Sequence, residues 1–185
     1  MRRTRQAGWT LIELMVTVAI IAVLAAIGIA TLQPMVWRGR VAEVATNFKL
    51  VSTNQETYFN EFGEYVGNGW APVAPVALTG KSTLAWPTPT SVMISGYEQI
   101  GYRPDKETTW HAFRMVACPD VSQAPCVNHP CGSAPLHFPS GYAGPGFIME
   151  AQGDVNGDGV LGVYCATSRS SVPIILSEDW PGQNT

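Results

Sequence analysis

The chain has 185 residues, of which 46% are apolar and only 14% are charged, and its formal net charge is −3 at pH 7. This length suits one domain with a core of its own. The low charge argues against a disordered polymer and against an electrostatic nucleic-acid binder. We therefore expect a folded protein with no sequence-specific nucleic acid among its partners.

The N-terminal segment joins a short basic stretch to a long apolar run. Residues 1–8 contain Arg2, Arg3 and Arg5, and the 24 residues from Leu14 to Trp37 carry no charge. At about 1.5 Å per residue a helix of that length spans about 36 Å, which is enough to cross a hydrocarbon layer of about 30 Å. The arginines orient the N-terminus toward the cytoplasm, so the rest of the chain is expected on the outer side.

Glu13 is the one charged residue inside this apolar segment. A carboxylate in hydrocarbon is costly unless it is paired or reaches the interface. A plain anchor gains nothing from such an acid, whereas a helix that recognises a partner can use it to demand a cationic neighbour. The alternative is that the side chain of Glu13 reaches the headgroups.

The segment Ala7–Ile21, AGWTLIELMVTVAII, resembles the class III signal of type IV prepilins and type II secretion pseudopilins. The resemblance implies that a prepilin peptidase cuts after Gly8 and that Trp9 becomes the methylated N-terminal residue. It also implies that Glu13 acts in assembly by meeting the freed amine of Trp9, on its own chain or on the next one.

Two positions depart from the pattern of that family. Trp9 stands where the family usually has Phe, and it keeps a large aromatic side chain at the cleavage point. The helix-breaking proline of the family would fall at Ala30, whereas this chain has Pro34. Since proline removes a helical hydrogen bond, we expect a kink near Pro34.

From Arg38 the pattern becomes amphipathic. Apolar residues recur at steps of three and four, with one polar interruption, and the stripe consists of Val41, Val44, Phe48, Val51, Gln55, Tyr58 and Phe62. Gly63 follows as a C-cap. The sequence therefore predicts one helix over residues 9–62, with an apolar polymerisation segment at 9–37 and an amphipathic segment at 38–62.

Residues 63–185 read as a loop-rich antiparallel β domain. Four strands are predicted in two hairpins, and they are Gly96–Arg103 with Thr109–Cys118, and Gly146–Gln152 with Val160–Thr167. We expect a surface loop from Gly67 to Pro89 and a loose tail over 172–185 with an apolar patch, Val172–Leu176. The expected fold class is α+β, with the long helix packed on a four-stranded antiparallel sheet, as in type IV pilins.

Four cysteines lie in this half of the chain, Cys118, Cys126, Cys131 and Cys165. An even number in an oxidising compartment indicates two disulfides, for which three pairings exist. We favour Cys118 with Cys126 and Cys131 with Cys165, because the first bond pins a proline-rich loop. The alternative is zinc, since His129 and His137 fall among the cysteines, although their spacing fits no common zinc module.

The loop that contains Asp154, Asn156 and Asp158 offers oxygen ligands at alternate positions, followed by Gly159. This matches the opening of a calcium loop, so calcium is the one candidate cofactor. The twelfth position is Cys165, so a remote acid would have to complete the site, and the candidates are Glu150, Glu178 and Asp179. The alternative is a hairpin turn, because Asp, Asn and Gly also favour tight turns.

The sequence presents no recognisable catalytic arrangement, and we expect no enzyme. The resemblance implies a structural subunit, a major or minor pilin, of a type IV pilus or pilus-like filament that serves adhesion, twitching motility or DNA uptake. The partners would be other pilin subunits, the prepilin peptidase and the inner-membrane assembly platform. The chain would lie in the inner membrane and then in an extracellular filament or a periplasmic pseudopilus. The alternatives are a secretion pseudopilin and a monomeric membrane-anchored extracytoplasmic binding module.

Overall fold

The computed structural model describes residues 8–72, 83–88, 94–126, 128–129, 131, 138 and 142–177. The chain divides into two compact units, which meet between Arg38 and Gly39. Helix α1, Leu11–Phe62, is continuous through both units, Pro34 included.

The first part of α1 is apolar on all sides. Within Leu11–Ile29 the mean hydropathy is 2.6, and none of this segment is buried by the rest of the chain. A helix that is hydrophobic all round requires surroundings other than water. By length and composition this helix could cross a membrane, which agrees with the predicted apolar segment.

The second part of α1 buries one face. Val44, Phe48 and Val51 are all at most 3% exposed, which confirms the predicted apolar stripe at these positions, whereas Phe62, its last predicted member, is 58% exposed. The helix ends as predicted, because Gly63 has φ of 77°, and its N–H donates to the carbonyl of Phe59 at 2.8 Å. A glycine in this left-handed conformation satisfies one of the last carbonyls of the helix and turns the chain away.

Gln55, the polar interruption of the stripe, is fully buried. Its Nε2 donates to the carbonyl of Val66 at 2.5 Å, and the N–H of Val66 donates to its Oε1 at 3.0 Å. One amide therefore satisfies both backbone groups of a buried residue that lies outside any strand, where they would otherwise lack partners.

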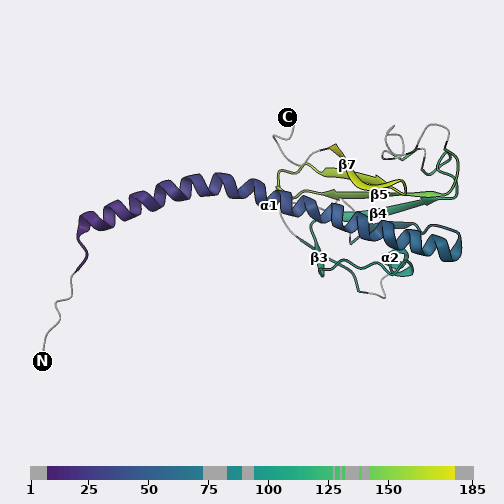
Figure 1. The fold of residues 1–185 in the computed structure, drawn as a ribbon, viewed down its shortest axis with the longest axis horizontal. Helices are drawn as coiled ribbons and strands as arrows, with labels where there is room; N and C mark the ends of the chain where they lie inside the picture. The colour runs from purple at the N-terminus through teal and green to yellow at the C-terminus, as the bar shows by residue number, and fades with distance from the viewer. Residues whose placement is uncertain are drawn as a thin grey trace, which may run out of the picture. The chain divides into compact units, whose positions relative to one another are not determined.

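Five antiparallel strands form the main sheet in the order β1-β4-β5-β6-β7 (Figure 1). Their bounds are Asn68–Ala71 for β1, Ala112–Cys118 for β4, Gly146–Gly153 for β5, Gly162–Thr167 for β6 and Ser170–Ser177 for β7. A separate two-stranded sheet pairs β2, Leu84–Ala85, with β3, Thr108–Thr109, and a short helix, α2, spans Ser95–Gln99. The α+β class is confirmed, with more strands than the four predicted.

The two faces of the main sheet bury different groups. Phe113 and Met149 belong to the core that also contains Phe48 of α1, and the rings of Phe48 and Phe113 meet edge to face at 6.3 Å. The alternate positions Ile148 and Cys165 belong to a second cluster on the other face. Successive residues of a strand point to opposite faces, so the same strands line both cores.

The predicted hairpin of Gly96–Arg103 with Thr109–Cys118 is wrong. The first of these segments begins with helix α2, in which Tyr97 is buried, and Ile100, three residues later, is buried as well. This is a helical spacing. Gly96 also lies very close to Gly67. A Cβ added at Gly96 would lie 2.4 Å from the carbonyl oxygen of Gly67. The second segment does form β4, but it pairs with β1 and β5.

The second predicted hairpin is confirmed, since β5 and β6 pair in antiparallel register. The predicted loose tail is wrong over Val172–Leu176, which lies in β7 at the edge of the sheet. Pro173 weakens the strand signal in the sequence, but an edge strand tolerates proline. The described part of the predicted 67–89 loop is also not a plain surface loop, because it contains β1 and β2, and Trp86 is buried.

Candidate processing and assembly site

The predicted cleavage point lies just before α1. Gly8 and Trp9 are outside the helix, which begins at Leu11, and the side chain of Trp9 is 75% exposed. A peptidase requires an accessible backbone that is not engaged in helical hydrogen bonds. The peptide bond between Gly8 and Trp9 meets this requirement.

Glu13 forms a capping box with Thr10 at the start of α1. The backbone N–H and the hydroxyl of Thr10 both donate to Oε2 of Glu13, at 2.9 and 2.8 Å. The N–H of Glu13 donates in return to the hydroxyl of Thr10 at 3.3 Å. This reciprocal pattern satisfies backbone donors that the first turn of a helix leaves without partners. The motif Thr-x-x-Glu is the sequence signal for this cap, and Thr10 was not among the predicted site residues.

A shallow groove at this end of the first unit is lined by Trp9, Ile12, Glu13, Val16 and Thr17. Two of the three residues of the predicted processing and assembly site, Trp9 and Glu13, line it, and the third, Gly8, directly precedes Trp9 in the chain. The groove is mostly apolar around one carboxylate. Such a surface suits contact with an apolar partner that carries one positive charge.

Comparison with known proteins bears on this same segment. Residues 3–29 match the family model of the prokaryotic N-terminal methylation motif. This motif is a class III signal. The resemblance seen in Ala7–Ile21 is thereby confirmed.

Similarity to one known protein points the same way. The chain is 44% identical over 61 residues to the type IV major pilin protein PilA of Myxococcus xanthus. The aligned part makes up 33% of this chain, which spans only about 28% of the length of that pilin. No solved structure matches the chain.

The predicted calcium loop is held by its own hydrogen bonds. Asp154, which is buried, accepts from the N–H groups of Gly157 at 2.6 Å and Gly159 at 3.1 Å. Asn156 accepts from the N–H of Asp158 at 2.7 Å. Both glycines have positive φ, 79° and 86°. These contacts account for the residue types as a turn. Calcium binding stays a prediction that they do not test.

Arg40 of α1 joins this loop to the helix. Its Nη1 donates to the carbonyl of Val155 at 2.6 Å, and its guanidinium lies 3.9 Å from the ring centroid of Trp110. Glu43, one turn further along, accepts from the N–H of Trp110 at 3.0 Å. The helix is thus tied by polar contacts to two loops at one end of the second unit. Nothing in the sequence pattern indicated these pairs, because their members are far apart along the chain.

The cysteines form two disulfides on the sheet face opposite α1. Cys118 is bonded to Cys126, and Cys131 is bonded to Cys165. All four are at most 2% exposed, and the structure leaves no cysteine free among the residues that it describes. Zinc held by these thiols is therefore excluded in the disulfide form. His137, Glu178 and Asp179, which were candidates for zinc or calcium, lie outside the described residues.

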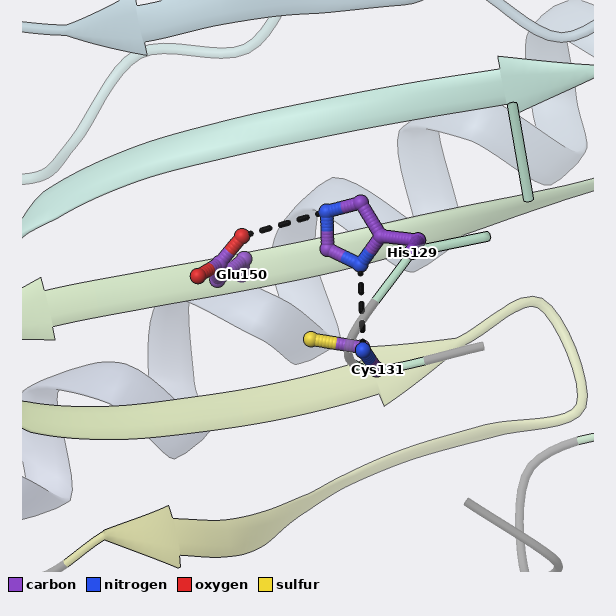
Figure 2. A group of neighbouring side chains, drawn as sticks. All are labelled: His129, Cys131 and Glu150. Atoms are coloured by element: carbon purple, nitrogen blue, oxygen red, sulfur yellow. Dashed lines mark hydrogen bonds and ion pairs between the residues drawn. The ribbon is translucent and has the colours of Figure 1, made fainter. Parts of the chain in front are cut away.

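A cluster of charged residues lies beside the second disulfide. Arg114 of β4 donates to Glu150 of β5, its direct cross-strand partner. His129 Nε2 lies 3.2 Å from the same carboxylate, and Gln152 donates to its other oxygen at 2.6 Å. Burial raises the pKa of Glu150, but the hydrogen bonds from His129, Gln152 and Arg114 lower it below its usual value. His129 and Glu150 were named only as candidates for separate metal sites, because their contact with each other (Figure 2) and with Arg114 depends on tertiary structure.

Proposed function

We propose that the chain is a subunit of a type IV pilus or a pilus-like filament, processed after Gly8 and assembled through the apolar part of α1. The class III signal carries this proposal, because the matched residues 3–29 include the whole exposed apolar segment Leu11–Ile29 of α1. The similarity to a major pilin supports it. Each unit then has a separate task, since the first supplies the membrane span and the second a folded domain on the outer side.

The apolar surface of this helix must stay out of water both before and after assembly. Before assembly the apolar side chains of Leu11–Ile29 are covered by lipid of the inner membrane. In a filament the helices of neighbouring subunits replace the lipid, so that the apolar surface stays dry. The partners in this proposal are other pilin subunits, the prepilin peptidase and the inner-membrane assembly platform. The final location is an extracellular filament.

Glu13 sets the register of subunits in this proposal. Its capping bonds to Thr10 use Oε2, and the proposal assigns Oε1 to the amine that cleavage frees on Trp9, in the same or the next subunit. In a dry bundle an unpaired charge is disfavoured, and loss of one partner of a buried ion pair costs about 3–5 kcal/mol. A helix shifted out of register would therefore be rejected.

N-terminal mass spectrometry of sheared filaments tests the processing step. We expect the chain to begin at Trp9 and to carry one methyl group on its amine. Gly8→Val should leave the leader attached, whereas Gln6→Ala, a change within the leader, should leave processing unchanged. A filament protein that retains its leader would contradict the proposal. An unprocessed chain that stays in the membrane would favour the monomeric binding module.

Glu13→Gln tests the role of the charge without removing the cap. Glutamine at this position still offers an oxygen to Thr10, so the start of the helix should be unchanged. We expect the variant to be cleaved at the wild-type rate and to stay in the membrane fraction, absent from sheared filaments. Thr46→Val, which changes an exposed polar side chain further along the same helix and outside the groove, should be incorporated normally. Wild-type incorporation of Glu13→Gln would refute the proposed ion pair.

A further inference from the structure

The loop between β5 and β6 contains a chemically labile pair of residues, Asn156 and Gly157. The main-chain nitrogen that follows an asparagine can attack the side-chain carbonyl and expel ammonia. This step is easiest before glycine, which has no side chain to obstruct it. The sequence contains the pair twice, since Asn68 precedes Gly69 in β1. Because the two sites have different surroundings, the fold decides which of them can react.

A carboxylate contacts the nitrogen of Gly157, which is the attacking atom at the first site. The N–H of Gly157 donates to Oδ1 of Asp154 at 2.6 Å, and Asp154 is only 4% exposed. A backbone amide is a poor nucleophile until it loses its proton, and a base at this distance is within reach of that proton. The loop sets this position, because Gly157 has φ of 79°, a conformation that other residues rarely adopt.

The side chain of Asn156, which supplies the carbonyl under attack, is folded back along the chain. Its Oδ1 accepts from the N–H of Asp158 at 2.7 Å, and its Nδ2 donates to Oδ2 of Asp158 at 2.9 Å. The first contact closes a small ring that includes the nitrogen of Gly157. It also places a donor on the oxygen that becomes negatively charged when that nitrogen attacks. Gly157 is exposed, so water can reach the product.

Asn68, in the second pair, is held in a different way. It is 9% exposed, and its Oδ1 accepts from the N–H of Gly96 at 2.9 Å. Asn68 also pairs with Met115 across β1 and β4. A ring that joins the side chain of asparagine to the next nitrogen fixes the dihedral ψ of asparagine outside the range of a strand. Reaction at Asn68 would therefore break the pairing of β1, whereas Asn156 lies in a loop.

We propose that Asn156 is a self-modification site, which its loop converts to aspartate and isoaspartate through a cyclic imide. The nitrogen of Gly157 gives its proton to Asp154 and forms a bond to Cγ of Asn156. The bond from Cγ to Nδ2 then breaks, and Nδ2 takes the proton from Asp154 and leaves as ammonia. Water opens the imide at either of its two carbonyl groups, and no other reactant is needed.

The modification changes a loop that is joined to α1. It adds one negative charge at position 156, directly after Val155, whose carbonyl accepts from Arg40. The isoaspartate form also routes the main chain through the side-chain carbon and so lengthens the loop. Because ammonia is lost, the change accumulates with the age of each molecule. The inference rests on this loop alone and is independent of the proposed filament.

Peptide mapping of the full chain in detergent micelles tests the proposal. The protein is incubated at neutral pH in heavy-oxygen water with a calcium chelator, because a bound cation would engage the same oxygens. Samples taken over time are digested, and mass spectrometry with chromatographic separation distinguishes asparagine, aspartate and isoaspartate. We expect labelled aspartate and isoaspartate to appear at position 156 while Asn68 stays unchanged.

The same incubation in guanidinium chloride shows what the fold contributes. In the unfolded chain the two pairs have similar local surroundings, so Asn68 and Asn156 should react at similar rates. We expect Asn156 to react about 10-fold faster in the folded chain than in the unfolded one, because only the fold holds Asp154 against the nitrogen of Gly157.

Asp154→Asn separates the base from the shape of the loop. Asparagine at this position keeps an oxygen for the N–H of Gly157 but cannot take up its proton. We expect an unchanged circular dichroism spectrum and a reaction at Asn156 that is slower by about 100-fold, at the lower end of what a general base contributes. Asp105→Asn, which removes an exposed carboxylate in another loop, should leave the rate unchanged.

Three results would overturn the proposal. If Asn156 reacted no faster in the folded chain than in the unfolded one, the loop would not promote the reaction. A wild-type rate in Asp154→Asn would exclude Asp154 as the base. Aspartate without any isoaspartate would exclude the cyclic imide. The first and third results come from the wild-type chain, so the proposal can fail even where the variant does not fold.

Discussion

The two faces of the main sheet are stabilised in different ways. On the face toward α1, ring and aliphatic side chains such as Phe48 and Phe113 fill a continuous core. On the opposite face Val121 and Phe138, from the segment between β4 and β5, belong to a second apolar cluster, and both disulfides and the ion pair of Arg114 with Glu150 lie there. A helix supplies its own backbone hydrogen bonds and a ready apolar stripe, whereas an irregular loop supplies neither. Covalent and charged contacts therefore add to apolar burial where no helix covers the sheet.

The largest effect is expected on the face toward α1. Phe48 is only 1% exposed, and Phe48→Ala should reduce the free energy of unfolding by about 3–5 kcal/mol, because it removes a ring and leaves a cavity. Phe62, on the same helix and 58% exposed, is the matched control, and Phe62→Ala should change it by less than about 0.5 kcal/mol. Urea unfolding of the full chain in detergent micelles, followed by circular dichroism, measures both. Similar losses for the two variants would show that this face is not a packed core.

On the opposite face, the contribution of each disulfide to the free energy of unfolding should depend on the length of the loop that it closes. The separation is 34 residues for Cys131–Cys165 and 8 for Cys118–Cys126. On chain-entropy grounds the first bond contributes about 4 kcal/mol and the second about 2.5 kcal/mol. Paired Cys→Ser replacements, unfolded in urea, should show this order. The reverse order would mean that local packing, and not loop closure, holds this face.

The face toward α1 could be predicted from the sequence far better than the other. The spacing of Val44, Phe48 and Val51 determines a helix with one buried stripe, and Gly63 ends it, because these signals are local. The class III signal is local as well, which is why Gly8, Trp9 and Glu13 could be named from the sequence. Where the periodicity was ambiguous, as around Tyr97, the predicted strand was wrong.

The cluster on the opposite face depends on strand register. Arg114, Glu150 and Cys165 become neighbours only because β4, β5 and β6 pair as they do. Their sequence separations are large, and none of the three belongs to a recognisable motif. Edge strand β7 escaped prediction for a related reason, since its place next to β6 is a tertiary property. Local patterns cannot report such contacts.

Glu150→Gln should have an intermediate effect. The carboxylate accepts hydrogen bonds from charged Arg114, and hydrogen bonds to charged groups contribute about 1.5–3 kcal/mol each. We expect a loss of about 2 kcal/mol in the free energy of unfolding at pH 7. Gln152→Leu, which removes a neutral donor to the same carboxylate, should cost less. An equal loss in both variants would show that the charge of Arg114 adds nothing.

The difference in the free energy of unfolding between wild type and Glu150→Gln should depend on pH. The pKa of Glu150 is lowered in the folded chain from its ordinary value of 4.5. Its ionised form therefore stabilises the fold above about pH 4.5, and this contribution is lost as the pH falls further. Because glutamine does not titrate, the difference between wild type and Glu150→Gln should shrink on acidification. A difference that stays constant down to pH 3 would contradict the lowered pKa.

The smallest effect is expected at the one polar residue in the stripe of α1. Gln55→Leu adds apolar surface to the core but removes both hydrogen bonds to the backbone of Val66, which is itself 8% exposed. Each buried backbone group left without a partner costs about 1–3 kcal/mol, and the gain from a buried leucine offsets part of this. We therefore expect a net loss of about 1 kcal/mol in urea unfolding. Gln55→Glu, which keeps the acceptor but loses the donor, should lose more, because it also buries a charge. If Gln55→Leu were more stable than the wild type, apolar burial alone would stabilise the face toward α1. Polar contacts would then add stability only on the opposite face.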